Sequence, residues 1–253
     1  NMNLAPFSFF NAIGSNPPMV IFSPARSGRD NTTKHTLDNA DAMKEVVINI
    51  VNYPIVQQMS LASSAYPKGV NEFVKAGLTP IPSELVKPFR VKESIVQMEC
   101  KVRDIIRTGE TGGAGNIIIC EIVLMHIDES ILDENGRPDP YKMDLVARMG
   151  GEYYCRVIPE SIFALAQPKD GSALGIDKLP EYIRNSSILT GNNLGQLGVF
   201  AHHPTKEEVE AIVHLMRHHM SWQEIELQAK ILIDKGEAWE GFKVLMLKSY
   251  QLV

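Results

Sequence analysis

The first 23 residues restrict the fold of this chain more than any other stretch. Two apolar runs, at residues 3–10 and 19–22, flank the sequence Asn16-Pro17-Pro18. Valine, isoleucine and phenylalanine are enriched in strands, and consecutive prolines are tolerated only at a sheet edge or in a turn. We therefore predict a strand, a turn and a second strand, and we expect the first strand to begin upstream of Asn1.

Small and polar residues interrupt this predicted hairpin. They are Asn3, Ala5, Ser8, Asn11, Ser15 and Asn16. On a strand, side chains of this kind leave backbone N–H and C=O groups open to a flat polar ligand. The simpler interpretation is a half-buried hairpin with one face in water, and the spacing alone leaves both interpretations open.

The composition limits the class of protein. A chain of 253 residues with 44% hydrophobic residues can form one large domain, or one domain with an appendage. A net charge of −5 argues against nucleic-acid binding, and no apolar run reaches the ~18 residues of a membrane span. Cys100, Cys120 and Cys155 lie far apart and form no C-x-x-C motif. We expect buried free thiols and a reducing compartment, the cytoplasm.

Turn signals and short apolar runs dominate the chain up to residue 157. Strands are expected at residues 46–51, 95–102, 105–108, 116–127 and 147–157, and helices near Lys34, after Pro54 and at residues 70–76. The glycine-rich residues 111–115 predict a hairpin loop, and Asn135-Gly136 predicts a turn. Because strands outnumber helices and long helical crossovers are missing, we predict a mainly β fold with helices, built as an antiparallel barrel.

The character of the chain changes at Pro204. Thr205 with Glu208, and Ser221 with Glu224, have the spacing of capping boxes that begin helices. Apolar residues follow each box at helical spacing, at Val209, Ile212, Val213 and Met216 and then at Ile225, Ala229, Leu232 and Ile233. Residues 237–250 predict a third helix. We therefore expect a domain over residues 1–203 and a helical C-terminal extension over residues 204–253.

A cluster of basic and hydroxyl residues follows the predicted hairpin, just before the first helix. It comprises Arg26, Ser27, Arg29, Thr32, Thr33, Lys34 and Thr36. The N-terminus of a helix has unpaired N–H groups and a partial positive charge, and arginine and lysine add donors that suit phosphate. The cluster is a candidate site for one phosphate group. The alternative is a solvated surface loop that leads into a capped helix.

Short blocks of sequence resemble the flavin reductase-like family, most closely its flavoredoxin-type branch. The blocks lie in the family's order at residues 3–10, 15–18, 34–39, 66–69, 76–79, 97–100, 121–123, 126–128, 148–151 and 188–192. They span about residues 1–200. The resemblance implies the FMN-binding split-barrel fold, a split antiparallel β-barrel. The family's strand upstream of Asn1 lies outside this sequence, and the helices after about residue 204 are not part of the family's core pattern.

The resemblance also implies a homodimer that binds one FMN per subunit near the subunit interface. The residues implied along the isoalloxazine ring and ribityl chain are Asn3, Ala5, Phe9, Ser15 and Asn16. Those implied at the phosphate are Ser23, Arg29, Lys34 and Thr36. Lys68 and His126 are implied near the ring or the substrate pocket, with His126 as the candidate catalytic residue. A hydrogen-bonded structural role for His126 is the alternative.

Two activities fit these implications. One is an NAD(P)H-dependent reductase, in which NADH or NADPH gives hydride to FMN and the flavin passes electrons to a further acceptor. The other is a flavoredoxin-like electron carrier, which a protein partner reduces and which has no nicotinamide site. Because a flavin supplies its own redox chemistry, neither activity needs an acid–base pair from the protein.

Five of the seven histidines lie in the C-terminal extension or just before it, at His202, His203, His214, His218 and His219. His214 and His218 are four residues apart and could share one helix face as metal ligands. No H-E-x-x-H motif is present and no carboxylate obviously completes a site. We therefore expect a solvated polar face and no metal.

Overall fold

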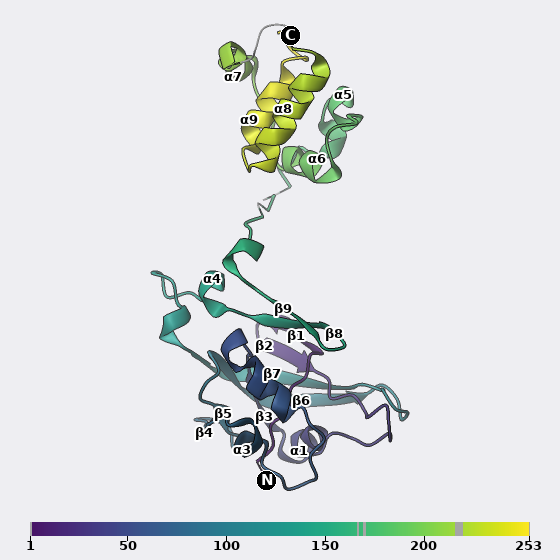
Figure 1. The fold of residues 1–253 in the computed structure, drawn as a ribbon, viewed down its shortest axis with the longest axis vertical. Helices are drawn as coiled ribbons and strands as arrows, with labels where there is room; N and C mark the ends of the chain where they lie inside the picture. The colour runs from purple at the N-terminus through teal and green to yellow at the C-terminus, as the bar shows by residue number, and fades with distance from the viewer. Residues whose placement is uncertain (1, 166, 169–170, 216–219, 253) are drawn as a thin grey trace. The chain divides into compact units, whose positions relative to one another are not determined.

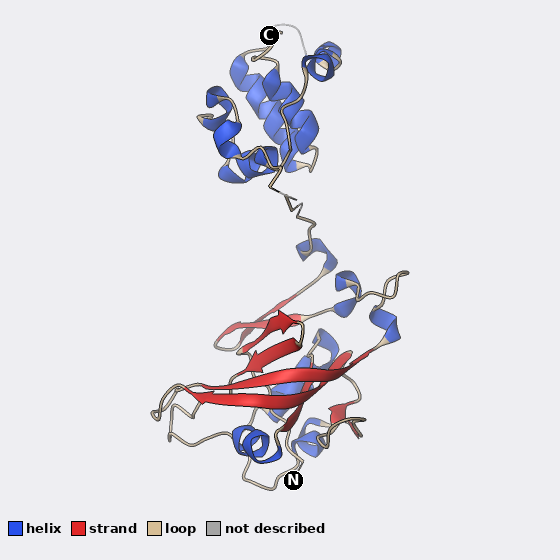
Figure 2. Cartoon of the chain, turned by 180° about the vertical axis from the view of Figure 1, so that it is seen from behind, coloured by secondary structure: helices blue, strands red, loops and turns tan. Residues whose placement is uncertain are grey.

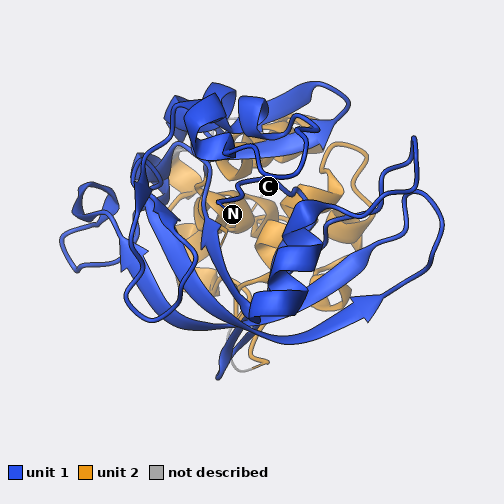
Figure 3. Cartoon of the chain, turned by 90° about the horizontal axis from the view of Figure 1, so that it is seen from below, with its two compact units in different colours: residues 1–163 blue, residues 164–253 orange. Residues whose placement is uncertain are grey.

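The computed structural model describes every residue except 1, 166, 169–170, 216–219 and 253. Its contacts divide the chain into two compact units, residues 1–163 and residues 164–253 (Figure 3). The strands belong to the first unit, here called the β unit, and the described part of the second, the helical unit, contains helices (Figure 2). The division between the units falls earlier than the expected boundary at 203/204.

The β unit is built on a five-stranded antiparallel sheet with the strand order β1-β2-β7-β6-β3 (Figure 1). The strands are β1 (Phe10–Ser15), β2 (Pro18–Phe22), β3 (Glu45–Asn49), β6 (Val96–Arg107) and β7 (Asn116–Ile127). The two strands expected at residues 95–102 and 105–108 are one long strand, whose pairing with β7 shifts register near Cys100 and Asp104. Across the described residues the strands do not close into a barrel.

The opening hairpin is present, but its first strand lies closer to the turn than we predicted. Ser15 pairs with Pro18, so only Asn16 and Pro17 connect the two strands. This tight connection draws residues 11–15 into the strand opposite β2. The segment before Phe10 is irregular instead, and Glu72 binds it through the backbone N–H of Leu4.

The remaining elements of the β unit are short. They are α1 (His35–Met43), η1 (Tyr53–Ile55), α2 (Val56–Ala62), α3 (Glu72–Ala76), β4 (Pro80–Ile81), β5 (Arg90–Val91), η2 (Glu129–Ile131), α4 (Pro140–Met143), β8 (Val146–Gly150), β9 (Tyr153–Arg156) and η3 (Pro159–Ser161). The single strand predicted at residues 147–157 is a hairpin, because Gly150 and Gly151 take positive φ angles of 108° and 54° and reverse the chain.

The core of the β unit joins one face of the large sheet to α1. Val20 and Phe22 from β2, Cys120 from β7 and Leu37 from α1 all belong to this core. Cys100 and Cys120 are fully buried free thiols, and burial raises the pKa of Cys120 to about 12. Cys155 is exposed on β9, so the expectation of a buried thiol is wrong for this residue.

The helical unit comprises η4 (Ile176–Lys178), α5 (Glu181–Arg184), α6 (Gly191–Gly198), α7 (Lys206–Glu210), η5 (Val213–Leu215), α8 (Trp222–Asp234) and α9 (Ala238–Met246). Both predicted capping boxes are confirmed: Thr205 and Ser221 accept hydrogen bonds from the backbone N–H groups of Glu208 and Glu224, whose side chains bond back. Met216, His218 and His219 lie outside the described residues.

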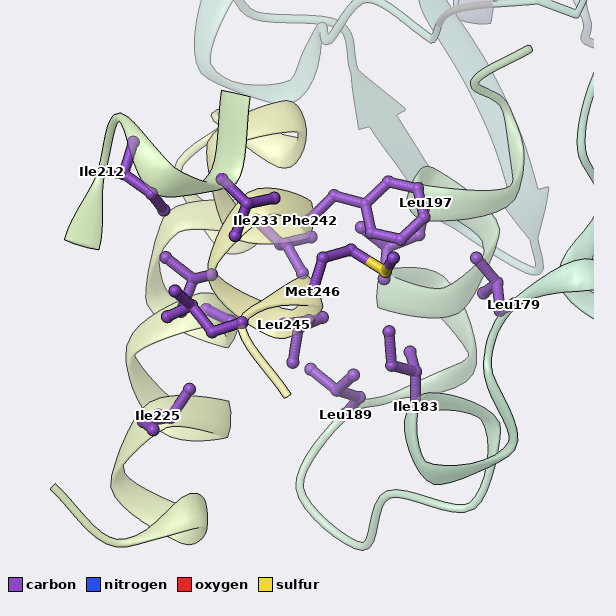
Figure 4. Close-up of a cluster of buried hydrophobic side chains, with 14 residues drawn as sticks. Leu179, Ile183, Leu189, Leu197, Ile212, Ile225, Ile233, Phe242, Leu245 and Met246 are labelled. Atoms are coloured by element: carbon purple, nitrogen blue, oxygen red, sulfur yellow. The ribbon is translucent and has the colours of Figure 1, made fainter. Parts of the chain in front are cut away.

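The core of the helical unit includes residues from well before Pro204. Leu179, Ile183, Leu189 and Leu197 pack in one cluster with residues of α8 and α9, including Phe242 (Figure 4). These early residues therefore belong to the same compact unit as the last helices, which explains why the division lies near residue 163. No helix in the described parts of either unit combines the length and the hydropathy that a bilayer crossing requires.

Candidate functional site

The candidate phosphate loop, residues 23–34, connects β2 to α1 and is braced by the hairpin loop between β6 and β7. The backbone N–H of Arg26 donates to the carbonyl oxygen of Ala114 at 2.9 Å, and that of Gly113 donates to the carbonyl oxygen of Arg26 at 3.1 Å. The backbone N–H of Asn116 donates to Ser23 Oγ at 3.0 Å. The Ser23 hydroxyl proton remains available to a ligand because its oxygen is the acceptor in this bond.

Two glycines of the hairpin loop allow this close contact. A Cβ atom on Gly115 would lie 3.0 Å from Ser23 Oγ, and one on Gly112 would lie 3.0 Å from the carbonyl oxygen of Ser27. The glycine-rich composition of residues 111–115 therefore serves the packing of the hairpin against the phosphate loop.

Asn31 organises the centre of the phosphate loop. It takes a left-handed backbone conformation with φ of 57°, and it accepts two hydrogen bonds of 2.7 Å from the Arg26 guanidinium, one through Oδ1 and one through its carbonyl oxygen. Its own side-chain N–H donates to the carbonyl oxygen of Glu110 at 2.9 Å. Hydrogen bonds from Ser27 and Thr32 lower the pKa of Asp30 to about 2, so this carboxylate stays ionised.

The start of α1 suits an anion. Lys34 is the N-cap residue in an extended conformation, and no side chain caps the helix. The first N–H groups of the helix therefore lack the side-chain acceptor that usually satisfies them. Lys34 is exposed at this helix start, and Arg29 is exposed in the loop that precedes it. Together with the Ser23 hydroxyl, these groups match the donors and the positive charge that a phosphate group needs.

Asn3 lies against the same helix and is held from two sides. Thr36 Oγ1 donates to Asn3 Oδ1 at 2.8 Å, and Asn3 Nδ2 donates to Glu72 Oε1 at 3.4 Å. The second carboxylate oxygen of Glu72 accepts from the backbone N–H of Leu4 at 3.2 Å. Asn3, Lys68 and Glu72 also line one small pocket. The structure thus brings the predicted residues Asn3, Thr36 and Lys68 together, although the Thr36 hydroxyl proton is already used by Asn3.

Sequence reasoning missed Glu72. Its side chain is only 5% exposed, and it fixes the irregular segment before β1 to the start of α3. The available signal is slight: Glu72 directly follows Asn71, whose side chain caps α3 by accepting from the N–H of Phe73 at 3.0 Å. An acid in the first turn of a helix is ordinarily explained by the helix dipole alone.

The residues predicted along the flavin ring are distributed along the opening hairpin. Phe9 adjoins the phosphate loop, because the backbone N–H of Ser23 donates to its carbonyl oxygen at 2.9 Å, and its side chain is 69% exposed. Ala5 lies in the preceding irregular segment and is partly exposed. Ser15 and Asn16 are at the opposite end of the hairpin, where five residues of strand after Phe10 span roughly 17 Å.

His126 is not close to the phosphate loop along the sheet. It lies ten residues from Asn116 on β7, which corresponds to roughly 33 Å of strand. Its Nε2 atom is 2.7 Å from Oε1 of Glu99, a residue with 0% exposure. Glu99 also accepts hydrogen bonds from the backbone N–H groups of Glu84, Leu85 and Val86. This geometry favours the structural alternative for His126.

Comparison with known proteins identifies the class to which this architecture belongs. The family model described as the flavin reductase like domain matches residues 1–144, which is more than half of the 253 residues. The chain therefore belongs to the flavin reductase-like family, as the resemblance of its sequence blocks predicted.

Individual relatives agree with this assignment. A protein of Aquifex aeolicus is 37% identical over 159 residues, which cover 63% of this chain and 79% of the relative. Nitrilotriacetate monooxygenase component B from Bacillus cereus has 30% identity and a TM-score of 0.59 over 64% of this chain and 79% of its own. A protein of Shewanella frigidimarina, described as a flavin reductase with a split barrel domain, has 28% identity and a TM-score of 0.55 over 65% of this chain and 79% of its own.

Proposed function

We propose that this protein binds FMN and uses it as an NAD(P)H-dependent reductase of a flavin or another small electron acceptor. The observation that carries the proposal is the phosphate loop, which holds the Ser23 hydroxyl and two exposed cations and leads into an uncapped helix start whose Thr36 contacts Asn3. Membership of the flavin reductase-like family supports a flavin as the phosphate-bearing ligand. We also propose a split-barrel architecture, as described for the Shewanella protein, and a cytoplasmic location, which the buried free thiols support.

The proposed roles divide between the two ends of the ligand. FMN, when bound, supplies the hydride and electron transfer chemistry. Ser23, Arg29, Lys34 and the first N–H groups of α1 hold its phosphate. Asn3, positioned by Thr36 and Glu72, offers a fixed amide to the polar part of the flavin. Ala5, Phe9, Ser15, Asn16 and Lys68 complete the proposed binding set.

A homodimer is part of the same proposal. Large apolar side chains are exposed at the start of the edge strand β1, along it and on the hairpin β8–β9, including Phe9 just before β1 at 69%, Ile13 at 52%, Met149 at 68% and Tyr153 at 79%. Exposed apolar side chains gathered on a few elements are typical of surfaces that bind another protein. A second subunit would cover this surface and bring a second copy of the hairpin residues.

Anaerobic spectroscopy tests the activity directly. We expect the purified protein, supplied with FMN, to show flavin absorbance that bleaches on addition of NADH or NADPH, because a bound nicotinamide can pass hydride to the flavin. If millimolar NADH and NADPH both leave the bound flavin oxidised, the proposed reductase activity is contradicted. The alternative function, a flavoredoxin-like electron carrier, is then favoured. A protein that takes up no FMN contradicts both functions.

The phosphate roles are tested by comparing FMN with riboflavin, which lacks the phosphate. We expect Lys34→Ala to raise the Kd of FMN about tenfold, since each charge-assisted hydrogen bond to an ionised group contributes about 1.5–3 kcal/mol, and to leave the Kd of riboflavin unchanged. Lys44→Ala is the matched control, because Lys44 ends the same helix and pairs with Asp41. An equal loss for both flavins would show that Lys34 acts through the fold and not on the phosphate.

A further inference from the structure

An irregular segment, here called the strap, covers Glu99 on β6. It comprises residues 82–89, which connect the short strands β4 and β5. The backbone N–H groups of residues 84–86 donate to the Glu99 carboxylate at 2.8, 2.6 and 3.2 Å, and that of Lys87 donates to Glu45 of β3 at 2.8 Å. Two carboxylates of the sheet therefore hold four consecutive residues of the strap.

Apolar contacts contribute little to the attachment of the strap. Leu85 is 55% exposed and Phe89 is 37% exposed, whereas Val86 is buried. Segments with few buried apolar side chains open locally at a lower free-energy cost than the core of a domain. The hydrogen bonds to Glu99 are therefore the main restraint on opening of the strap.

His126 of β7 contacts both the sheet and the strap at this point. Its Nε2 atom is 2.7 Å from Oε1 of Glu99, and its Nδ1 atom is 3.8 Å from Oε1 of Glu84 in the strap. Burial raises the pKa of Glu99, but the N–H groups of residues 84 and 85 and the His126 side chain lower it below its usual value, so this carboxylate is ionised. An ionised carboxylate only accepts hydrogen bonds. Nε2 of His126 therefore carries a proton, and Nδ1 is the atom that gains or loses one.

Two carboxylates and one guanidinium surround the His126 ring. The carboxylates are those of Glu99 and Glu84. The guanidinium is that of Arg90 on β5, whose Nε is 3.8 Å from the same oxygen of Glu99 and whose N–H groups donate to Gln97 and to a carbonyl oxygen of the strap. Gln97, which is paired with His126 across the strands, is uncharged. Because hydrogen bonds between ionised partners are roughly twice as strong as neutral ones, a proton on Nδ1 strengthens both contacts of the ring.

We propose that His126 is a proton-dependent latch for the strap. When Nδ1 is protonated, the imidazolium binds Glu99 and Glu84 together and keeps the strap closed over β6. When Nδ1 loses its proton, the attraction to Glu84 ends and Glu99 keeps only a neutral donor, so the strap opens more often. Stability that comes from a protonated histidine is present at lower pH and is lost as the pH rises. This latch does not depend on flavin binding.

Hydrogen exchange of the full chain at two pH values tests the latch. Since histidine side chains change charge between about pH 5 and about pH 8, we expect the protection factors of the N–H groups of residues 84–86 to be about fivefold higher at about pH 6 than at about pH 8. His126→Gln keeps a side-chain donor for Glu99 but has no group that changes charge, so its protection should be the same at both pH values. His35→Gln is the matched control, because His35 is the other histidine of residues 1–163 and lies at the start of α1. We expect it to leave the pH dependence unchanged.

Equal protection of residues 84–86 at the two pH values in the unsubstituted chain contradicts the latch. A pH dependence that persists in His126→Gln, or disappears in His35→Gln, contradicts it as well. If His126→Gln abolishes the protection at both pH values, NMR titration of the unsubstituted chain decides, with the His126 imidazole signal identified by its absence from the variant. The latch then stands only if the protection of residues 84–86 changes over the same pH range as this signal.

Discussion

Replacing Glu99 with alanine is expected to lower the free energy of unfolding of the β unit by about 3–5 kcal/mol, the range for breaking a buried charged contact. Glu99 is fully buried in β6 and accepts backbone hydrogen bonds from residues 84, 85 and 86 as well as one from His126. Its removal leaves all of these donors without their acceptor, and each buried unsatisfied donor is costly. Urea titration with hydrogen exchange on peptides from β6 and β7 measures the change.

Acid should weaken the same contact. Burial alone would raise the pKa of Glu99, but the N–H groups of Glu84 and Leu85 and the His126 side chain lower it below its ordinary value of 4.5. A carboxyl group with a lowered pKa in the folded state stabilises the protein above pH 4.5, and this contribution is lost as the pH falls through the lowered value. In the Glu99→Ala variant, the loss of stability that comes from protonation of Glu99 at low pH should be absent.

Glu121→Ala is the control for this experiment. Glu121 is a partly exposed acid on the neighbouring strand β7, where it pairs with the exposed Arg103. Such a pair contributes about 1 kcal/mol or less. If both variants lose similar stability, Glu99 does not hold residues 84–86 in the way that the structure indicates.

Gly241→Ala is expected to destabilise the helical unit by about 1–3 kcal/mol, the usual cost of overpacking. Gly241 lies in α9 at its contact with α8, where a Cβ atom would be 2.6 Å from Ile233 Cγ1 and 2.8 Å from the carbonyl oxygen of Ala229. The second of these atoms belongs to the backbone, so the helices must separate. Both tryptophans of the chain, Trp222 and Trp239, lie in these two helices. Tryptophan fluorescence during thermal unfolding therefore reports on the helical unit alone.

The control is a glycine-to-alanine change of opposite expected sign. Gly195 lies inside α6, and a Cβ atom there would have no neighbour within 4 Å. Alanine at this position should stabilise the helical unit by about 0.5–1 kcal/mol, because glycine loses more backbone freedom in a helix. Equal effects of the two substitutions would contradict the close α8–α9 contact.

Local sequence patterns correctly predicted the helices and strands whose signals lie within their own residues. The capping residues Thr205 and Ser221 begin α7 and α8, and the largely apolar residues 116–127 form β7 with the predicted bounds. The basic residues of the phosphate loop were visible for the same reason. Each of these features depends on neighbours within a few positions along the chain.

Such patterns could not predict contacts between residues that lie far apart along the chain. Glu99 and His126 each have an ordinary place on a strand, and only the pairing of β6 with β7 brings them within hydrogen-bond distance. Glu72 and Asn3 are 69 positions apart. The division of the chain near residue 163 was not predicted either. Leu179 and Leu197 belong to the core of the helical unit, and only their packing in the folded structure shows this.

The unequal burial of the three cysteines makes the chain suitable for selective chemical labelling. Thiol reagents attack the thiolate, and burial raises the pKa of both Cys100 and Cys120 while it closes off access to them. Cys155 is exposed on the β8–β9 hairpin, next to the exposed Tyr154. A maleimide dye should therefore attach at one position without any cysteine replacement, and its emission would report directly on whether a second subunit covers that hairpin.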